Sequence, residues 1–103
     1  HSGMDIAAPE GTEVITPLGG EVIIASNFFY KGNVIYVNHG AGLVSSYSHL
    51  SKLEVKKGDK IKTGDIIGLV GQTGRVTGPH LHWEVYLMGV PINPEVFLVT
   101  SNL

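Results

Sequence analysis

Glycine is the residue that most constrains how this chain can fold. Fourteen glycines are spread over 103 residues, and between them stand short runs rich in valine, isoleucine and other residues that favour extended backbone. Apolar residues spaced three and four apart over a helical length are hard to find, apart from a short turn after Pro94. The runs that read as strands are residues 12–16, 20–25, 33–38, 43–49, 66–70 and 81–87. We therefore predict an all-β fold, a small antiparallel sheet or sandwich-like domain.

The length predicts one domain over residues 1–103, because a chain of this size can bury one apolar core. The hydrophobic fraction of 43% is ordinary for a globular protein. No apolar run approaches the roughly twenty residues of a membrane-spanning helix. Because the chain opens on His1 rather than methionine, we expect it to be trimmed at its N-terminus, with any targeting signal outside it.

Charge and cysteine content narrow the partners and the metal chemistry. The net charge is -2 and the seven Lys and Arg are mostly dispersed, so we expect no nucleic acid or anionic lipid partner. Cysteine is absent, so any metal must be held by nitrogen and oxygen ligands, and zinc remains compatible with that.

The most informative segment is Gly78-Pro-His-Leu-His-Trp-Glu-Val-Tyr-Leu87, which reads as a strand entered through a Gly-Pro loop. Because side chains alternate along a strand, His80, His82, Glu84 and Tyr86 should share one face. The alternate residues, Trp83 among them, should supply the core. Two imidazoles side by side can bind a metal or donate hydrogen bonds, and a pair of solvated strand histidines is the alternative. Glu84 could accept a hydrogen bond from a ligand histidine, or form a surface ion pair.

Two further segments carry candidate site residues. The opening His1-Ser-Gly-Met-Asp5 adds an imidazole and a carboxylate around Gly3, which would let the backbone pass close to a metal. A disordered terminus and a turn cap are the alternatives for His1 and Asp5. In Leu43-Val-Ser-Ser-Tyr-Ser-His-Leu50, alternation predicts that Tyr47 and His49 share a face. A buried, hydrogen-bonded histidine is the alternative for His49, and His39 is interpreted as structural.

Together these segments resemble the lysostaphin/LytM-type zinc metallopeptidases of the M23 family. Residues 1–12 read His-Ser-Gly-Met-Asp-Ile-Ala-Ala-Pro-Glu-Gly-Thr, against the family pattern H-x-G-x-D-I-A-A-P-x-G-T. Residues 47–50 match Tyr-x-His-Leu and residues 78–84 match G-P-H-L-H-x-E. The resemblance runs from His1 to about Leu98, nearly the whole chain.

The resemblance implies a role for each candidate residue. His1, Asp5 and His82 would bind one Zn2+, and His49 and His80 would be the unliganded pair that assists hydrolysis. The implied fold is a small antiparallel β domain with the metal in an open groove. The implied activity is that of a zinc endopeptidase that cuts peptide stems or cross-links of bacterial cell-wall peptidoglycan outside the cytoplasm. An inhibitory upstream segment or a regulatory protein is a compatible partner.

Zinc can lower the pKa of bound water to about 7, but proton transfer still needs a base and an acid. The H-E-x-x-H motif is missing, so His49 and His80 are the candidates, and the sequence leaves open which is the base. One alternative is a non-catalytic module of the same fold that binds the wall or activates another hydrolase. Another is a phosphocarrier or lipoyl-like carrier, suggested by the turns at Lys57-Gly-Asp59 and Gly64-Asp-Ile-Ile-Gly68. A carrier would need neither His1 nor Asp5.

Overall fold

The computed structural model describes residues 3–74 and 78–95, and this part of the chain forms one antiparallel sheet of nine strands. All-β architecture is thus confirmed. The strands are β1 (Met4–Ala7), β2 (Glu13–Ile15), β3 (Gly20–Phe28), β4 (Gly32–Gly40), β5 (Leu43–Leu53), β6 (Lys60–Ile61), β7 (Ile66–Val70), β8 (His80–Leu87) and β9 (Val90–Ile92).

Each of the six glycine-bounded runs predicted from the sequence is a strand, β2, β3, β4, β5, β7 or β8. The sequence did not predict β1, β6 and β9. These three have four, two and three residues, too few for a periodic pattern. Each of them pairs with a longer strand, β1 and β9 with β8, and β6 with β3. Long-range pairing, rather than local pattern, therefore makes them strands.

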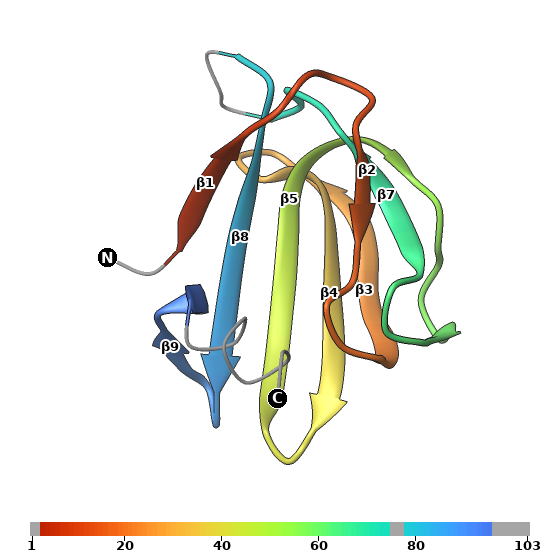
Figure 1. Cartoon of the computed structure of the whole chain (residues 1–103), viewed down its shortest axis with the longest axis vertical. Coiled ribbons are helices and arrows are strands. Elements are labelled where there is room, and N and C mark those ends of the chain that lie inside the picture. The colour runs from red at the N-terminus through yellow and green to blue at the C-terminus, as the bar shows by residue number, and fades with distance from the viewer. Residues whose placement is uncertain (1–2, 75–77, 96–103) are drawn as a thin grey trace.

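The long strand β5 organises the sheet. The main strand order is β1-β8-β5-β4-β3-β6, so β5 lies between β8 and β4. From Leu50 to Leu53 it also pairs with β7, which in turn pairs with β2. Figure 1 shows β5 running the length of the sheet and bending over at its end towards β7. Before the bend, antiparallel pairing places Ser48 of β5 opposite His82 near the start of β8, where two of the candidate histidines lie.

The core lies on the face of β8 opposite its histidines. Trp83 is 4% exposed and its cross-strand partner Tyr47 is 2% exposed, so the prediction that Trp83 packs in the core is correct. This face also borders an apolar pocket of about 230 Å³, lined by Ile6, Ile15, Pro17, Tyr47, Leu81 and Trp83. The pocket contains no candidate site residue, so the chemistry must be sought on the other face.

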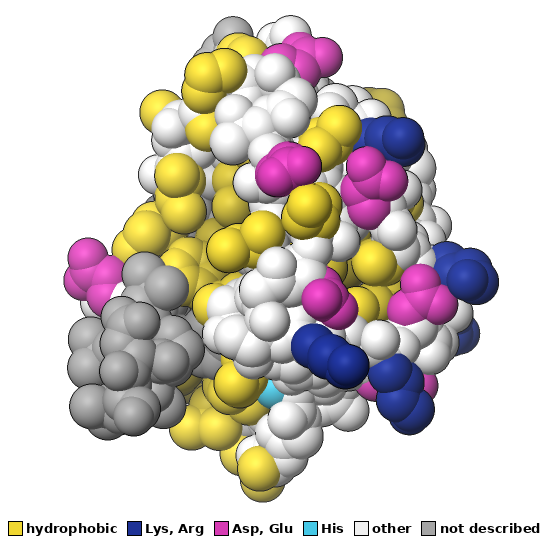
Figure 2. Space-filling view, turned by 45° about the vertical axis from the view of Figure 1, so that its right-hand side comes forward, with side chains coloured by type: hydrophobic (Ala, Val, Ile, Leu, Met, Phe, Trp, Pro, Cys, Tyr) yellow, Lys and Arg dark blue, Asp and Glu magenta, His cyan; other side chains and the backbone are white. Residues whose placement is uncertain are grey.

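Charges of both signs are interspersed on the face drawn in Figure 2, with lysine side chains beside aspartate and glutamate side chains. Ion pairs near the surface include Lys56–Asp59 at 3.3 Å and Lys60–Glu21 at 3.6 Å. Within residues 3–74 and 78–95, no helix has the length and hydropathy needed to cross a membrane.

Candidate metal and proton-transfer site

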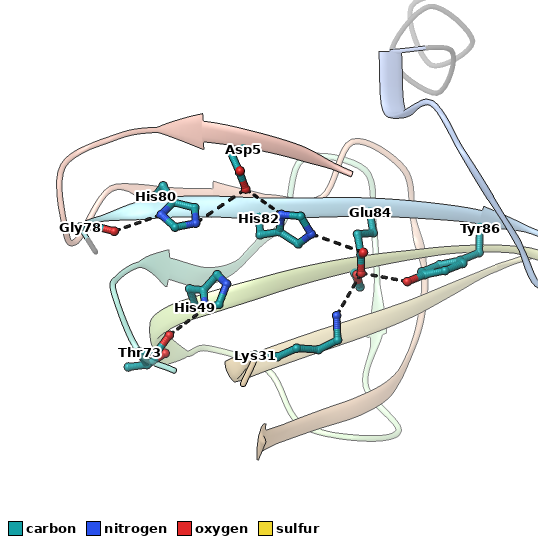
Figure 3. Close-up of polar contacts among 10 residues, drawn as sticks. Asp5, Lys31, His49, Thr73, Gly78, His80, His82, Glu84 and Tyr86 are labelled. Atoms are coloured by element: carbon teal, nitrogen blue, oxygen red, sulfur yellow. Dashed lines mark hydrogen bonds and ion pairs between the residues drawn. The ribbon is translucent and has the colours of Figure 1, made fainter. Parts of the chain in front are cut away.

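Strand β8 presents the predicted polar face. His80 and His82 project to the same side as Glu84 and Tyr86, as the contacts among them show: Tyr86 donates to Glu84 at 2.8 Å, and Glu84 Oε2 lies 3.3 Å from His82 Nε2. Figure 3 shows these side chains along one face of the strand. The alternation predicted for residues 80–87 is therefore confirmed.

Strand β1 brings Asp5 to this face. Asp5 is the antiparallel partner of His82, so the two side chains lie on the same side of the sheet. Asp5 Oδ1 lies 2.7 Å from His82 Nδ1 and 3.7 Å from His80 Nε2. One carboxylate oxygen therefore lies close to both imidazoles of β8 (Figure 3).

Gly3 lets the backbone before Asp5 lie against the ring of His82. A Cβ at this position would stand 2.7 Å from His82 Cε1 and 2.9 Å from His82 Nε2. Its φ of +153° is also one that residues with a side chain rarely adopt. The sequence predicted that Gly3 allows a close backbone approach, and the neighbour that requires the glycine is the ligand candidate itself.

Strand β5 supplies His49 through an irregularity. The prediction that Tyr47 and His49 share a face is wrong: Tyr47 packs with Trp83, whereas Ser46 and Ser48 lie on the side of Glu84 and His82. Between the pairs Ile35–Tyr47 and Asn33–Leu50, β5 uses one more residue than β4. His49 adopts a φ of +65° in this interval. The extra residue is a bulge that turns His49 onto the metal-candidate face.

The three imidazoles thereby form a cluster. The ring centroid of His49 lies 5.1 Å from that of His80 and 6.2 Å from that of His82. Together with Asp5, the cluster joins β1, β5 and β8, which are far apart in the sequence. Of the five site residues expected from the sequence, the structure brings these four together, and His1 lies outside the described residues.

Hydrogen bonds fix the ring protons of two of these histidines. A carbonyl oxygen can only accept, so His49 Nδ1–H donates to Thr73 O at 2.7 Å, and His80 Nδ1–H donates to Gly78 O at 3.0 Å. In their neutral forms both rings therefore carry a lone pair on Nε2. His82 differs, because both of its nitrogens face carboxylates. The three histidines thus fall into two chemical classes: His49 and His80 donate to main-chain carbonyls, whereas His82 lies between two carboxylates.

The local environment lowers the pKa values of Asp5, His49 and Glu84, in keeping with these two classes. The hydrogen bond from His82 lowers the pKa of Asp5 below its usual range. Burial lowers the pKa of His49 and outweighs the opposing hydrogen bond to Thr73, so that neutral His49 persists into mildly acidic solution. Burial alone would raise the pKa of Glu84, but hydrogen bonds led by those from Tyr86 and Lys31 lower it overall. Glu84 is therefore a buried carboxylate anion beside His82.

Lys31 is a contact residue that sequence reasoning missed. Its Nζ lies 3.1 Å from Glu84 Oε1, so the largely buried Glu84 forms a partly buried ion pair rather than the surface pair considered as the alternative. A lysine in a loop between two strands gives no local signal of such a contact.

The sequence model of peptidase family M23 matches residues 1–94. The chain belongs to this family. The M23 match includes every candidate site residue, and the strand arrangement agrees with it: the catalytic domain of lysostaphin from Staphylococcus simulans is 36% identical with a TM-score of 0.88, over 96% of this chain and 79% of that one. The lysostaphin-like M23 fold expected from the sequence is therefore confirmed.

Two relatives from Vibrio cholerae carry descriptions of chemistry. The peptidoglycan DD-endopeptidase ShyA is 50% identical over 93 residues, which are 90% of this chain and 22% of ShyA. The crystal structure described as a zinc containing peptidase is 42% identical with a TM-score of 0.87, over 89% of this chain and 28% of that one. This M23 domain thus spans between a fifth and a third of the length of these two relatives.

Proposed function

We propose that this M23 domain is a zinc-dependent endopeptidase that hydrolyses peptide bonds in bacterial cell-wall peptidoglycan. His1, Asp5 and His82 would hold one Zn2+, and His49 and His80 would move protons. The observation that carries the proposal is the cluster itself, in which Asp5 contacts His82 at 2.7 Å while His49 and His80 each keep an Nε2 lone pair directed away from their carbonyl partners.

The donor set fits zinc. A carboxylate oxygen and an imidazole nitrogen are ordinary zinc ligands, and Asp5 Oδ1 and His82 Nδ1 already face each other. Within the described residues, 3–74 and 78–95, no group of three His, Cys, Asp or Glu is arranged to hold a metal. The third donor proposed, His1, precedes that part of the chain. Three protein ligands would leave one tetrahedral position open, as in catalytic rather than structural zinc sites.

When bound, zinc would act as a Lewis acid that activates water and stabilises negative charge on the peptide carbonyl oxygen. The protein must then supply one group that accepts a proton and one that donates a proton to the leaving amine. Neutral His49 and His80 can accept at Nε2, and either can return the proton from the same atom. The lowered pKa of His49 keeps it in the accepting form at neutral pH.

The substrate class is proposed from the relatives. ShyA is named a peptidoglycan DD-endopeptidase, and lysostaphin is described as an antimicrobial peptidase. We propose that this domain likewise acts on peptide stems or cross-links of the wall, and therefore outside the cytoplasm, in the periplasm, the cell envelope or the medium.

Zinc content and activity of four single variants test the assignment of roles. Asp5→Ala and His82→Ala should lose both zinc and activity, because a ligand is removed. His49→Ala and His80→Ala should keep about one equivalent of zinc and lose most activity, because proton transfer acts on the transition state. Elemental analysis and digestion of defined muropeptides, followed by mass spectrometry, give the two readouts.

Two results would overturn the proposal. Equal zinc loss in all four variants would remove the division of roles. Zinc-loaded protein with native residues before and after this domain that leaves cross-linked and uncross-linked muropeptides uncut would favour a non-catalytic module that binds the wall or activates another hydrolase.

A further inference from the structure

The two carboxylate oxygens of Glu84 have different numbers of partners. Its Oε1 accepts from three donors: Tyr86 Oη at 2.8 Å, Lys31 Nζ at 3.1 Å and Ser46 Oγ at 3.3 Å. Its Oε2 lies 3.3 Å from His82 Nε2. Because all three donors contact Oε1, Oε2 is left to face the imidazole of His82. Glu84 is 8% exposed, so water offers little substitute for these contacts.

Lys31 is the only one of these three donors to Oε1 that carries a charge. It lies in the turn between β3 and β4, and its side chain is 34% exposed. A buried carboxylate that loses its cationic partner is strongly disfavoured, whereas the loss of one neutral hydrogen bond costs less. The orientation of Glu84 therefore depends more on Lys31 than on either hydroxyl.

The same residue also holds His49. The main-chain N–H of His49 donates to Lys31 O at 2.8 Å. The turn around Lys31 packs closely against residues 73 and 74. A Cβ on Gly32 would lie 2.4 Å from Thr73 Oγ1, and one on Gly74 would lie 2.6 Å from Tyr30 O. Thr73 O in turn accepts from His49 Nδ1. Lys31 is thus held where its main chain contacts His49 and its side chain contacts Glu84, the residue beside His82.

We propose that Lys31 is a positioning residue of the metal site, which acts through Glu84 to hold the His82 ring with Nδ1 towards Asp5. The proposal rests on the proposed function, in which Asp5 and His82 are ligands. A neutral imidazole that binds metal through Nδ1 must carry its proton on Nε2. Glu84 Oε2 is the acceptor placed for that proton (Figure 3).

Charge repulsion and positioning of Glu84 predict opposite changes in zinc affinity when Lys31 is removed, so the direction of the change distinguishes them. A cation near a Zn2+ site repels the metal, and its removal should then strengthen binding. If Lys31 positions Glu84, its removal should weaken binding. Loss of outer partners of ligand histidines weakens metal binding by about 10- to 100-fold. Because Glu84 itself remains, we expect about tenfold for Lys31→Met, the lower end of that range.

Zinc affinity, measured by competition with a chelator of known affinity, tests the proposal. Lys31→Met should bind zinc about tenfold more weakly, and Lys31→Arg, which keeps the charge, should retain most of the affinity. Lys52→Met is the matched control, because Lys52 is 63% exposed and its ion pair, with Glu54 at 3.8 Å, includes no candidate site residue. In zinc-loaded native protein, long-range nitrogen–proton NMR correlations should show the His82 proton on Nε2, with that signal broadened or lost in Lys31→Met.

Zinc binding by Lys31→Met as tight as native, or tighter, would overturn the proposal. If Asp5→Ala and His82→Ala also bind zinc normally, it is the proposed function that fails; if they lose zinc while Lys31→Met does not, only the role of Lys31 fails. Should Lys31→Met not fold, the double variant Lys31→Met/Glu84→Gln removes the pair without leaving a lone buried charge. Because this variant also replaces Glu84, a weakening of about tenfold or more is expected of it, and native affinity there would refute the proposal.

Discussion

Gly3→Ala is the sharpest test of how closely the N-terminal strand must approach the site. The added Cβ would lie 2.7 Å from His82 Cε1, whereas carbon atoms in favourable contact lie about 3.5–4.0 Å apart. Either the ring or the backbone must therefore move by about 0.8 Å or more to restore ordinary contact. Functional constellations tolerate displacements of about 0.5 Å. We expect the geometry of His82, a proposed zinc ligand, to be lost.

The free energy at stake follows from the backbone as well as from the contact. The φ of Gly3 is +153°, and a residue held in such a sparsely populated region costs about 1–3 kcal/mol. If this cost is relieved by pulling β1 away from β8, it appears as weakened zinc binding. At about 1.4 kcal/mol for each factor of ten, the expected loss of zinc affinity is about 5- to 140-fold.

Gly11→Ala is the matched control. Gly11 also has a positive φ, +91°, but a Cβ there meets no atom within 4 Å. Both variants carry a backbone penalty, and only Gly3→Ala crowds the ring. Chelator competition should show the loss in Gly3→Ala and about native zinc affinity in Gly11→Ala, with urea unfolding reporting the stability of each. Native zinc affinity in Gly3→Ala, or equal losses in both variants, would refute this reasoning.

Two pH effects are also expected. Activity should fall below about pH 6 as imidazoles protonate. Because the lowered pKa of His49 preserves its base form, we attribute the fall to loss of zinc. Recovery of activity at neutral pH should therefore require zinc and be blocked by a chelator. Activity that returns with the chelator present would contradict this. His39, which contacts Gly19 O at 2.8 Å and Ser45 Oγ at 2.7 Å, has a pKa lowered by burial below its usual 6.5. Below that pH the unfolded chain binds more protons than the folded one, so acid destabilises the fold. His39→Gln should flatten the fall of unfolding free energy between about pH 7 and 5 in urea titrations, and an unchanged slope would contradict it.

The features that the sequence predicted are those that depend on local periodicity. Polar and apolar residue types alternate along the sequence of β8, so the face that carries His80, His82 and Glu84 could be assigned from the sequence. The role of Gly3 was foreseeable because a glycine stands between two ligand candidates. By contrast, β1 is only four residues long, and its register, with Asp5 opposite His82, is set by pairing across the whole chain. No local pattern encodes that register.

His49 shows why the remaining geometry was not predictable. Strict alternation would leave it on the core face with Tyr47, and only the bulge in β5 turns it towards His80. The bulge requires a φ of +65°, which histidine tolerates better than most residues, and it requires an acceptor for a displaced N–H. Lys31 O is that acceptor, at 2.8 Å. The turn that contacts Glu84 thus also stabilises the irregularity that delivers the proton-transfer candidate, so changes in this turn should affect both halves of the site together.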